Sequence, residues 1–303
     1  MPTAPETHSA RYFALLYSPA PQRLVLDALF GIEREIFESL RPGLDHHVAH
    51  SRLQWWREEC ERTAAGRPVH PLTRALVDAL TKAPSSISPQ TSIGAKPPAV
   101  PSLPLLAGLC GLVDVAVWDL AGATFETRRE LTAYCERWSA AMIGSIAAPP
   151  NTTGTNASAT PDTRVVDWST LGAAMREIEM LSQLAREAHY GRLRVPLDEL
   201  ENAKVDPGAL AKPPWPSAVV EILRARHQWL RGEITRVLGE VDRLQQPDLR
   251  GLLVWAALAR RSSQRTERAL PGRLDLGPFD AVADAWFAWR IARRATIGRF
   301  RLN

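Results

Sequence analysis

Apolar residues recur along most of this chain at the three- and four-residue spacing that places them on one face of an α-helix. In the segment 23–40, Leu26, Phe30 and Phe37 follow this spacing, and Pro42 ends it. The same pattern predicts helices at residues 23–40, 53–65, 72–82, 105–121, 130–146, 169–189, 218–244, 252–270 and 279–294. No segment shows the alternation of a half-buried strand, so the pattern predicts an all-α protein.

Two stretches interrupt the helical pattern. Residues 84–104 are rich in proline and serine, and residues 149–163 are dominated by Asn, Thr, Ala, Gly and Pro. Both lack the apolar side chains that would offset the entropy lost on ordering. We therefore expect two long surface loops within a single domain that spans residues 1–303.

Charge and cysteine content restrict the function classes. A formal net charge of +4 is too small to indicate a nucleic-acid-binding protein. Three widely separated cysteines argue against a disulfide framework and fit a reducing compartment. The first residues lack the features of a secretory signal, and no apolar run reaches the roughly 18 residues of a membrane span. We expect a cytoplasmic protein that contacts the inner face of a membrane at most peripherally.

The segment 286–301 is the strongest candidate for such a contact. It combines aromatic side chains with five arginines and contains no acidic residue. A helix of this composition can lie on an anionic membrane with its aromatic face buried. It can equally close a helical bundle and turn a basic face to solvent, and the sequence leaves both interpretations open.

Three sequence motifs indicate which chemistry the protein is related to. The segment 171–196 begins Leu-Gly, ends Gly-Arg-Leu-Arg-Val-Pro, and resembles without a gap a metal-binding helix of the squalene and phytoene synthase family. That family's equivalent run is L-G-x-A-x-Q-L-T-N-I-L-R-D-x-x-E-D-x-x-x-G-R-x-Y-L-P. The segment 28–41 is similar to the family's first motif, A-L-Y-A-F-C-R-x-x-D-D-x-x-D, and residues 119–135 resemble a third, D-L-E-G-T-R-Y-x-T-x-x-E-L-x-x-Y-C.

The resemblance implies an all-α bundle of the isoprenoid (class I terpenoid) synthase type, with a central apolar cavity. In that family, aspartates hold magnesium, which neutralises the diphosphate that leaves a prenyl substrate. The two aspartates of the second motif fall here on Gln183 and Glu187, and the three of the first fall on Phe37, Glu38 and Arg41. Most of these carboxylates are therefore missing, and arginine, which binds phosphate but no metal, stands at one position.

A narrower resemblance concerns one branch of the family. Glu35-Ile36, the run R-L-Q-W-W-R-E at 52–58, and His70-Pro71 are similar to the branch that contains an assembly factor of respiratory complex I and its bacterial relatives. Members of this branch are commonly taken to have lost prenyl transfer. This resemblance implies an assembly or lipid-binding factor with a protein partner.

The resemblance gives seven candidate cavity or phosphate-binding residues: Glu35, Glu38, Arg41, Asp119, Gln183, Glu187 and Arg192. Glu38 and Glu187 are the candidate metal ligands and would hold Mg²⁺ if the protein is active. Alternatively, Glu35 pairs with a nearby arginine, Glu38 is solvated, and Arg192 forms a structural ion pair with Glu187 or Asp198. His46 and His50 lie one helical turn apart without a further ligand nearby, so we interpret them as surface residues.

Two functions follow from these motifs. The first is a non-catalytic or weakly catalytic assembly or lipid-binding factor that takes an isoprenoid or another lipid ligand. The second is an active magnesium-dependent prenyltransferase that joins two prenyl diphosphates head to head. The second requires magnesium to be held by the few carboxylates that remain.

Overall fold

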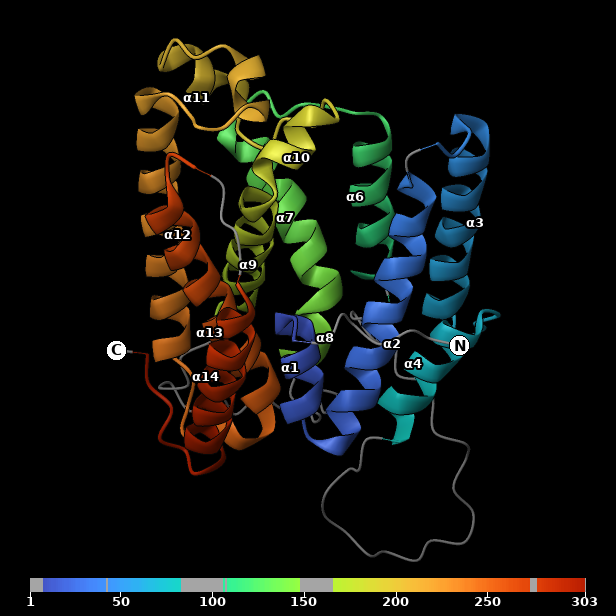
Figure 1. Cartoon of the computed structure of the whole chain (residues 1–303). Helices are drawn as coiled ribbons and strands as arrows, with labels where there is room; N and C mark the ends of the chain where they lie inside the picture. Colours follow the sequence, from blue (N-terminus) through green and yellow to red (C-terminus); the bar gives the residue numbers. More distant parts are fainter. Residues whose placement is uncertain are drawn as a thin grey trace, which may run out of the picture.

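The computed structural model describes residues 8–41, 43–82, 106, 108–147, 166–272 and 277–302, and all regular structure within them is helical (Figure 1). The longer helices are α2 (Ala20–Phe37), α3 (His46–Ala64), α7 (Arg128–Met142), α9 (Trp168–Ser182), α12 (Ser217–Gly239), α13 (Gln246–Ala269) and α14 (Pro278–Thr296). The shorter ones are α1 (Ala10–Tyr17), α4 (Pro71–Lys82), α6 (Cys110–Leu120), α8 (Gly144–Ala147), α10 (Leu184–His189), α11 (Leu197–Asn202), η1 (Glu38–Leu40) and η2 (Pro207–Ala211). The prediction of an all-α protein is confirmed.

The long helices lie side by side in a bundle (Figure 1). Helix α9 packs against α7, α12 and α13, while α2 packs on α4 and α3 packs on α6. The C-terminal ends of α2 and α6 and the short helix α10 lie at the same end of the bundle, which is the upper end in Figure 1. The candidate residues of the family motifs are concentrated at this end.

Aromatic side chains and one ion pair share the core. Trp138 of α7, Trp255 of α13 and Phe30 of α2 are buried, and the Trp255 ring lies 6.0 Å from Trp138 and 5.2 Å from Phe30. The Arg11 guanidinium of α1 lies within 6.0 Å of all three ring centroids. It pairs with buried Glu33, which also accepts a hydrogen bond of 2.7 Å from Trp138 Nε1. Burial of Glu33 is therefore compensated on two sides.

A glycine allows α7 and α9 to approach closely. A Cβ at Gly172 would lie 2.6 Å from Cγ1 of Ile143 and 2.8 Å from Cβ of Ser139. These distances are shorter than carbon atoms tolerate, so any larger residue would push the two helices apart. The contact holds α9 in place, and α9 carries one wall of the pocket described below.

Several observed helix ends lie up to seven residues from the predicted ones, and the largest shift is at the start of α3. Helix α3 begins at His46 rather than at residue 53, because Asp45 accepts hydrogen bonds from the amides of His47 and Val48 at 2.8 and 3.2 Å and so caps it. The predicted helix 169–189 is divided at Gln183 into α9 and α10. The predicted loops 84–104 and 149–163 lie outside the described residues.

The pattern did not predict α1, α11 or η2, which are short. Of the described helices, none is both long and apolar enough to span a bilayer.

Candidate functional site

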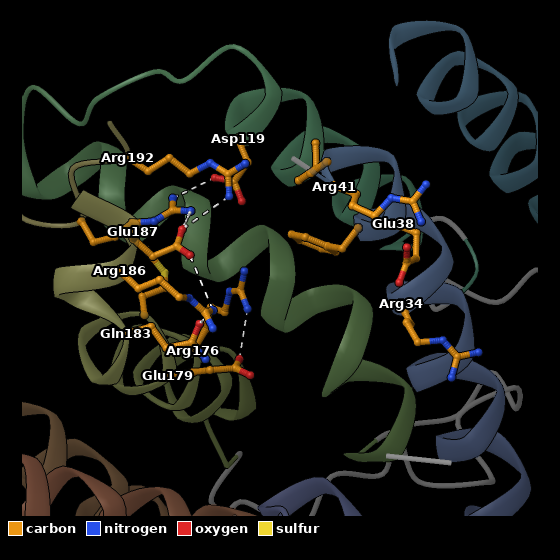
Figure 2. A pocket seen from close by; sticks show the side chains of 14 residues that line it. Arg34, Glu38, Arg41, Asp119, Arg176, Glu179, Gln183, Arg186, Glu187 and Arg192 are labelled. Atoms are coloured by element: carbon orange, nitrogen blue, oxygen red, sulfur yellow. Dashed lines mark hydrogen bonds and ion pairs between the residues drawn. The ribbon is translucent and has the colours of Figure 1, made fainter. Parts of the chain in front are cut away.

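A pocket of about 390 Å³ opens at the end of the bundle where α2, α6, α9 and α10 meet. It is lined by Arg34, Phe37, Glu38, Leu40, Arg41, Asp119, Arg176, Glu179, Met180, Gln183, Arg186, Glu187, Arg192 and Arg194. Six arginines face four carboxylates, which leaves a formal excess of two positive charges. Figure 2 shows Arg34, Glu38 and Arg41 on one wall, with Arg176, Glu179, Gln183 and Glu187 on the opposite wall.

Helical spacing explains which residues of the first motif face the pocket. Arg34, Glu38 and Arg41 follow one another at intervals of four and three residues, so they share a face of α2 and its continuation η1. Glu35 lies one residue off this face and does not line the pocket; its carboxylate is 3.9 Å from the Arg34 guanidinium. The interpretation of Glu35 as half of an ion pair therefore fits the structure better than its placement in the cavity.

Arg194 binds two carboxylates at the closed side of the pocket. Its Nη1 lies 2.7 Å from Asp119 Oδ1, and its Nη2 lies 2.9 Å from Glu187 Oε2. The side chains of Arg194 and Asp119 are only 4% and 2% exposed, so this pair is shielded from water. Tyr134 donates a hydrogen bond of 3.0 Å to the other oxygen of Asp119, and burial raises the Tyr134 pKa, which keeps its hydroxyl a neutral donor.

A second charged cluster lies on α9. Arg176 Nη1 and Arg11 Nη2 each lie 3.0 Å from an oxygen of Glu179. Burial alone would raise the pKa of Glu179, but the charges of Arg11 and Arg176 outweigh it, so its pKa lies below the usual value and it stays ionised. The Arg176 guanidinium also lies 5.4 Å from the Phe37 ring and 5.5 Å from the Trp138 ring. Arg176 is thereby fixed with its head at the pocket.

Some donor capacity at the pocket remains unused. The Nε atoms of Arg176 and Arg194 are buried and have no hydrogen-bond partner among the described residues. Arg41 is exposed at the mouth and has no ion pair within the part of the chain that the structure describes. An exposed guanidinium such as that of Arg41, beside five other arginines that line the pocket, suits a ligand with several anionic oxygens.

The carboxylates of the pocket do not fit a magnesium cluster. Glu187, a candidate metal ligand, lies 2.9 Å from Arg194, 3.6 Å from Arg192 and 3.8 Å from Arg186. Magnesium needs carboxylate oxygens that are free to coordinate it, and here arginines engage them. The other candidate, Glu38, projects from the opposite wall (Figure 2). Among the described residues, no group of three or more His, Cys, Asp or Glu side chains is arranged to hold a metal ion.

Six of the seven candidate residues from the sequence line this pocket: Glu38, Arg41, Asp119, Gln183, Glu187 and Arg192. The alternative ion pair between Arg192 and Glu187 is also present, so that arginine has both a structural partner and a place at the pocket. Sequence reasoning missed Arg34, Arg176 and Glu179 as pocket residues. Their spacing from Glu38 and Gln183 on the same helix faces was a usable signal.

Two other sequence interpretations concern α3. His46 and His50 are exposed, which agrees with their interpretation as surface residues. In the run 52–58, Trp56 is buried while Trp55 is 40% exposed, as expected for adjacent residues of a helix that packs on one side. Arg57 Nη2 lies 2.6 Å from Asp114 Oδ1 and links α3 to α6.

The sequence matches the model of one known protein family. The family model described as squalene/phytoene synthase matches residues 105–274, more than half of the chain. This match includes the segment 171–196 but not the segment 28–41. The search of curated proteins gave no match.

Solved structures that resemble most of the chain include two synthases. A dehydrosqualene synthase in complex with a ligand superposes with a TM-score of 0.70 at 14% identity, covering 94% of this chain and 92% of the other. The squalene synthase HpnC from Alicyclobacillus acidocaldarius gives a TM-score of 0.61 at 17% identity, covering 84% and 87%. At such low identity the likeness establishes a shared fold, the isoprenoid synthase bundle, and says nothing of activity.

Proposed function

Because the chain belongs to the squalene/phytoene synthase family, we propose that it binds a phosphate-bearing ligand in its arginine-rich pocket without magnesium-dependent prenyl transfer. In this proposal the protein is a binding or assembly factor on the scaffold of a prenyltransferase. Asp119 and Glu187, two of the carboxylates that could hold magnesium, are paired with arginines, and the arginines provide the positive charge that metal ions would otherwise supply.

The contact of Arg194 with both Asp119 and Glu187 carries this proposal. Asp119 and Glu187 come from two different elements, α6 and α10, and a cation between them is the arrangement that a metal site would require. Here the cation is a buried guanidinium, which has no vacant coordination position. A magnesium ion would have to displace Arg194 from two charge-assisted hydrogen bonds before it could bind either carboxylate.

The remaining arginines support binding of a phosphate-bearing group. Arginine recognises phosphate through two parallel N–H donors, and Arg41 and Arg176 line the pocket from opposite walls. The apolar residues Phe37, Leu40 and Met180 also line the pocket and can contact a hydrocarbon part of the ligand. This combination suits a prenyl diphosphate or the headgroup of another anionic lipid, and a volume of about 390 Å³ lies within the range of small-molecule pockets.

The role as an assembly factor rests on the motif resemblance of residues 35–36, 52–58 and 70–71. Packing explains part of that resemblance, since Leu53 and Trp56 are core residues and Arg57 pairs with Asp114. Gln54 and Trp55 are exposed on the same helix and remain available to a protein partner. We therefore place a protein contact on this face of α3 as part of the proposed function.

Two measurements on the purified protein test the proposal. Isothermal titration with farnesyl diphosphate, geranylgeranyl diphosphate and inorganic pyrophosphate in EDTA measures metal-free binding, and a coupled assay with added magnesium measures released pyrophosphate. We expect binding in EDTA and no sustained release. Arg176→Gln should weaken binding, whereas the exposed Arg236→Gln on α12, which does not line the pocket, should leave it unchanged.

Two other results would contradict the proposal. Sustained release of pyrophosphate with magnesium would overturn the proposal, and identification of the product would then decide whether the protein is the alternative, an active head-to-head prenyltransferase. Absence of binding by all three ligands would remove the phosphate-binding site and leave the protein contact as the function to pursue.

A further inference from the structure

The outward face of α14 carries an unusual concentration of exposed apolar side chains. Five of them are at least 45% exposed: Phe279, Val282, Trp286, Trp289 and Ile297. The first four recur at three- and four-residue spacing, so they share one side of the helix, and Ile297 follows directly after its last residue, Thr296. The opposite side is buried, with Ala288, Ile291, Ala292 and Ala295 against the bundle.

Helix α14 lies at the periphery of the fold, where it packs on α13 and α1 (Figure 1). None of its residues lines the arginine-rich pocket. A tryptophan that is half exposed costs free energy in water unless something covers it. The two tryptophans of α14 are therefore unexplained by the bundle core and by the proposed ligand site.

Positive charge is interleaved with these aromatic residues. The guanidinium of Arg290 lies 4.5 Å from the Trp286 ring, and that of Arg293 lies 5.4 Å from the Trp289 ring. The acids of α14, Asp280 and Asp284, turn toward α13, where arginines 261 and 265 bind them at 2.7 to 3.4 Å. The outward face is therefore basic and aromatic.

The same surface continues past the end of α14. Gly298 has a φ of +63°, and a Cβ there would lie 2.9 Å from the carbonyl oxygen of Arg243, so the α12–α13 turn lies alongside. Leu244 in that turn is 87% exposed. Arg294, Arg299 and Arg301 are exposed at this end of the chain and exceed in number the exposed acids of the turn and the start of α13, Asp242 and Asp248.

We propose that this surface, formed by the outward face of α14 together with Leu244, docks the protein on an anionic lipid bilayer. Tryptophan rings sit favourably at the depth of lipid headgroups, and arginine can extend its guanidinium to lipid phosphates while its stem stays among apolar groups. A second copy of this chain is a poorer occupant, because a symmetric contact would place arginines of both copies against each other. The surface is thus complementary to a negatively charged membrane.

Vesicle flotation of the full chain tests this docking. One set of vesicles contains phosphatidylcholine alone, and the other contains phosphatidylcholine with phosphatidylglycerol. We expect the protein to float only with the anionic vesicles. Arg290→Gln combined with Arg293→Gln should weaken partitioning by about 30-fold, because each arginine near the surface contributes about 1 kcal/mol.

The aromatic contribution has a matched control. Trp286→Ser with Trp289→Ser should weaken partitioning by at least about tenfold, since two rings lose their burial in lipid. Trp229→Ser should have no effect: Trp229 is 51% exposed on α12 and has Arg226 over its ring at 4.2 Å, but it lies outside the surface. Circular dichroism melting of each variant confirms that the bundle is intact.

Four outcomes would overturn the proposal. One is failure of the wild type to bind anionic vesicles, and another is equal binding by all variants. The third is a dimer in sedimentation equilibrium that disappears in the Trp286→Ser and Trp289→Ser variant, which would assign the surface to a second copy. Excess inorganic pyrophosphate should not release the bound protein; release would mean that the pocket, rather than α14, holds the lipid headgroup.

Discussion

Replacement of Arg194 by leucine would leave Asp119 buried and charged without its cation. The two side chains are 4% and 2% exposed, so water cannot take over the role of the guanidinium. Among the residues that the structure describes, Asp119 would keep only the hydrogen bond of 3.0 Å from Tyr134. Removing one partner of a buried ion pair costs about 3–5 kcal/mol, because the other charge remains desolvated.

Glu187 contributes little to this cost. It retains Arg192 at 3.6 Å and Arg186 at 3.8 Å after Arg194 is removed. We therefore expect Arg194→Leu to lower the free energy of unfolding at pH 7 by about 3–5 kcal/mol, nearly all of it through Asp119. Urea unfolding followed by far-UV circular dichroism measures this difference.

Two further variants separate the buried charge from general damage. Asp119→Asn added to Arg194→Leu removes the unpaired charge and keeps an acceptor for Tyr134, so at least half of the lost stability should return. Arg186→Leu removes an arginine that is 62% exposed and should cost less than about 1 kcal/mol. A cost below about 1 kcal/mol for Arg194→Leu itself would refute the argument that Arg194 compensates the buried charge of Asp119.

Three other predictions concern the pocket, a buried histidine and helix packing. Inorganic pyrophosphate in EDTA should raise the free energy of unfolding by about 2.7 kcal/mol at about 100 times its Kd, and Arg176→Gln should reduce this gain. Burial, followed by the charge of Arg231, lowers the pKa of His227 from 6.5 to about 4. Because the unfolded chain then binds more protons, stability should fall as pH drops from 6.5 to 4, by about 3 kcal/mol in total, and His227→Gln should remove this part of the pH dependence in urea titrations. Gly172→Ala should destabilise by about 1–3 kcal/mol through its clash with α7, while Gly232→Ala, with open space around its Cβ, should stabilise by about 0.5–1 kcal/mol in the same assay.

Helix periodicity predicted the main elements because it is a local property of the chain. Apolar residues at three- and four-residue intervals indicated most of the long helices, and the motifs around Gln183 and Arg192 indicated the family before any coordinates were compared. Periodicity failed where the signal was short or the backbone changed course. The eight-residue α1 carries too few turns for a pattern, and the division between α9 and α10 at Gln183 leaves no trace in the apolar spacing.

The residues of the candidate site were also predicted only in part from the sequence. Sequence motifs located six of the pocket residues and showed that most metal-binding aspartates are missing. They placed Glu35 in the cavity, although its offset of one residue from the face shared by Arg34, Glu38 and Arg41 puts it outside the pocket. They did not indicate Arg11, because its partner Glu179 lies 168 residues away in the chain.

The sequence by itself determined the helical scaffold, the family and the loss of acidic residues from the motifs. Each of these depends on residues that are close together in the chain. Only the tertiary structure decided what replaced the lost charge. It placed Arg194 between Asp119 and Glu187, Arg11 beside Glu179, and the aromatic side of α14 away from the core. Ion pairs and exposed faces depend on distances between helices that are remote in the chain, and packing of the whole bundle fixes those distances.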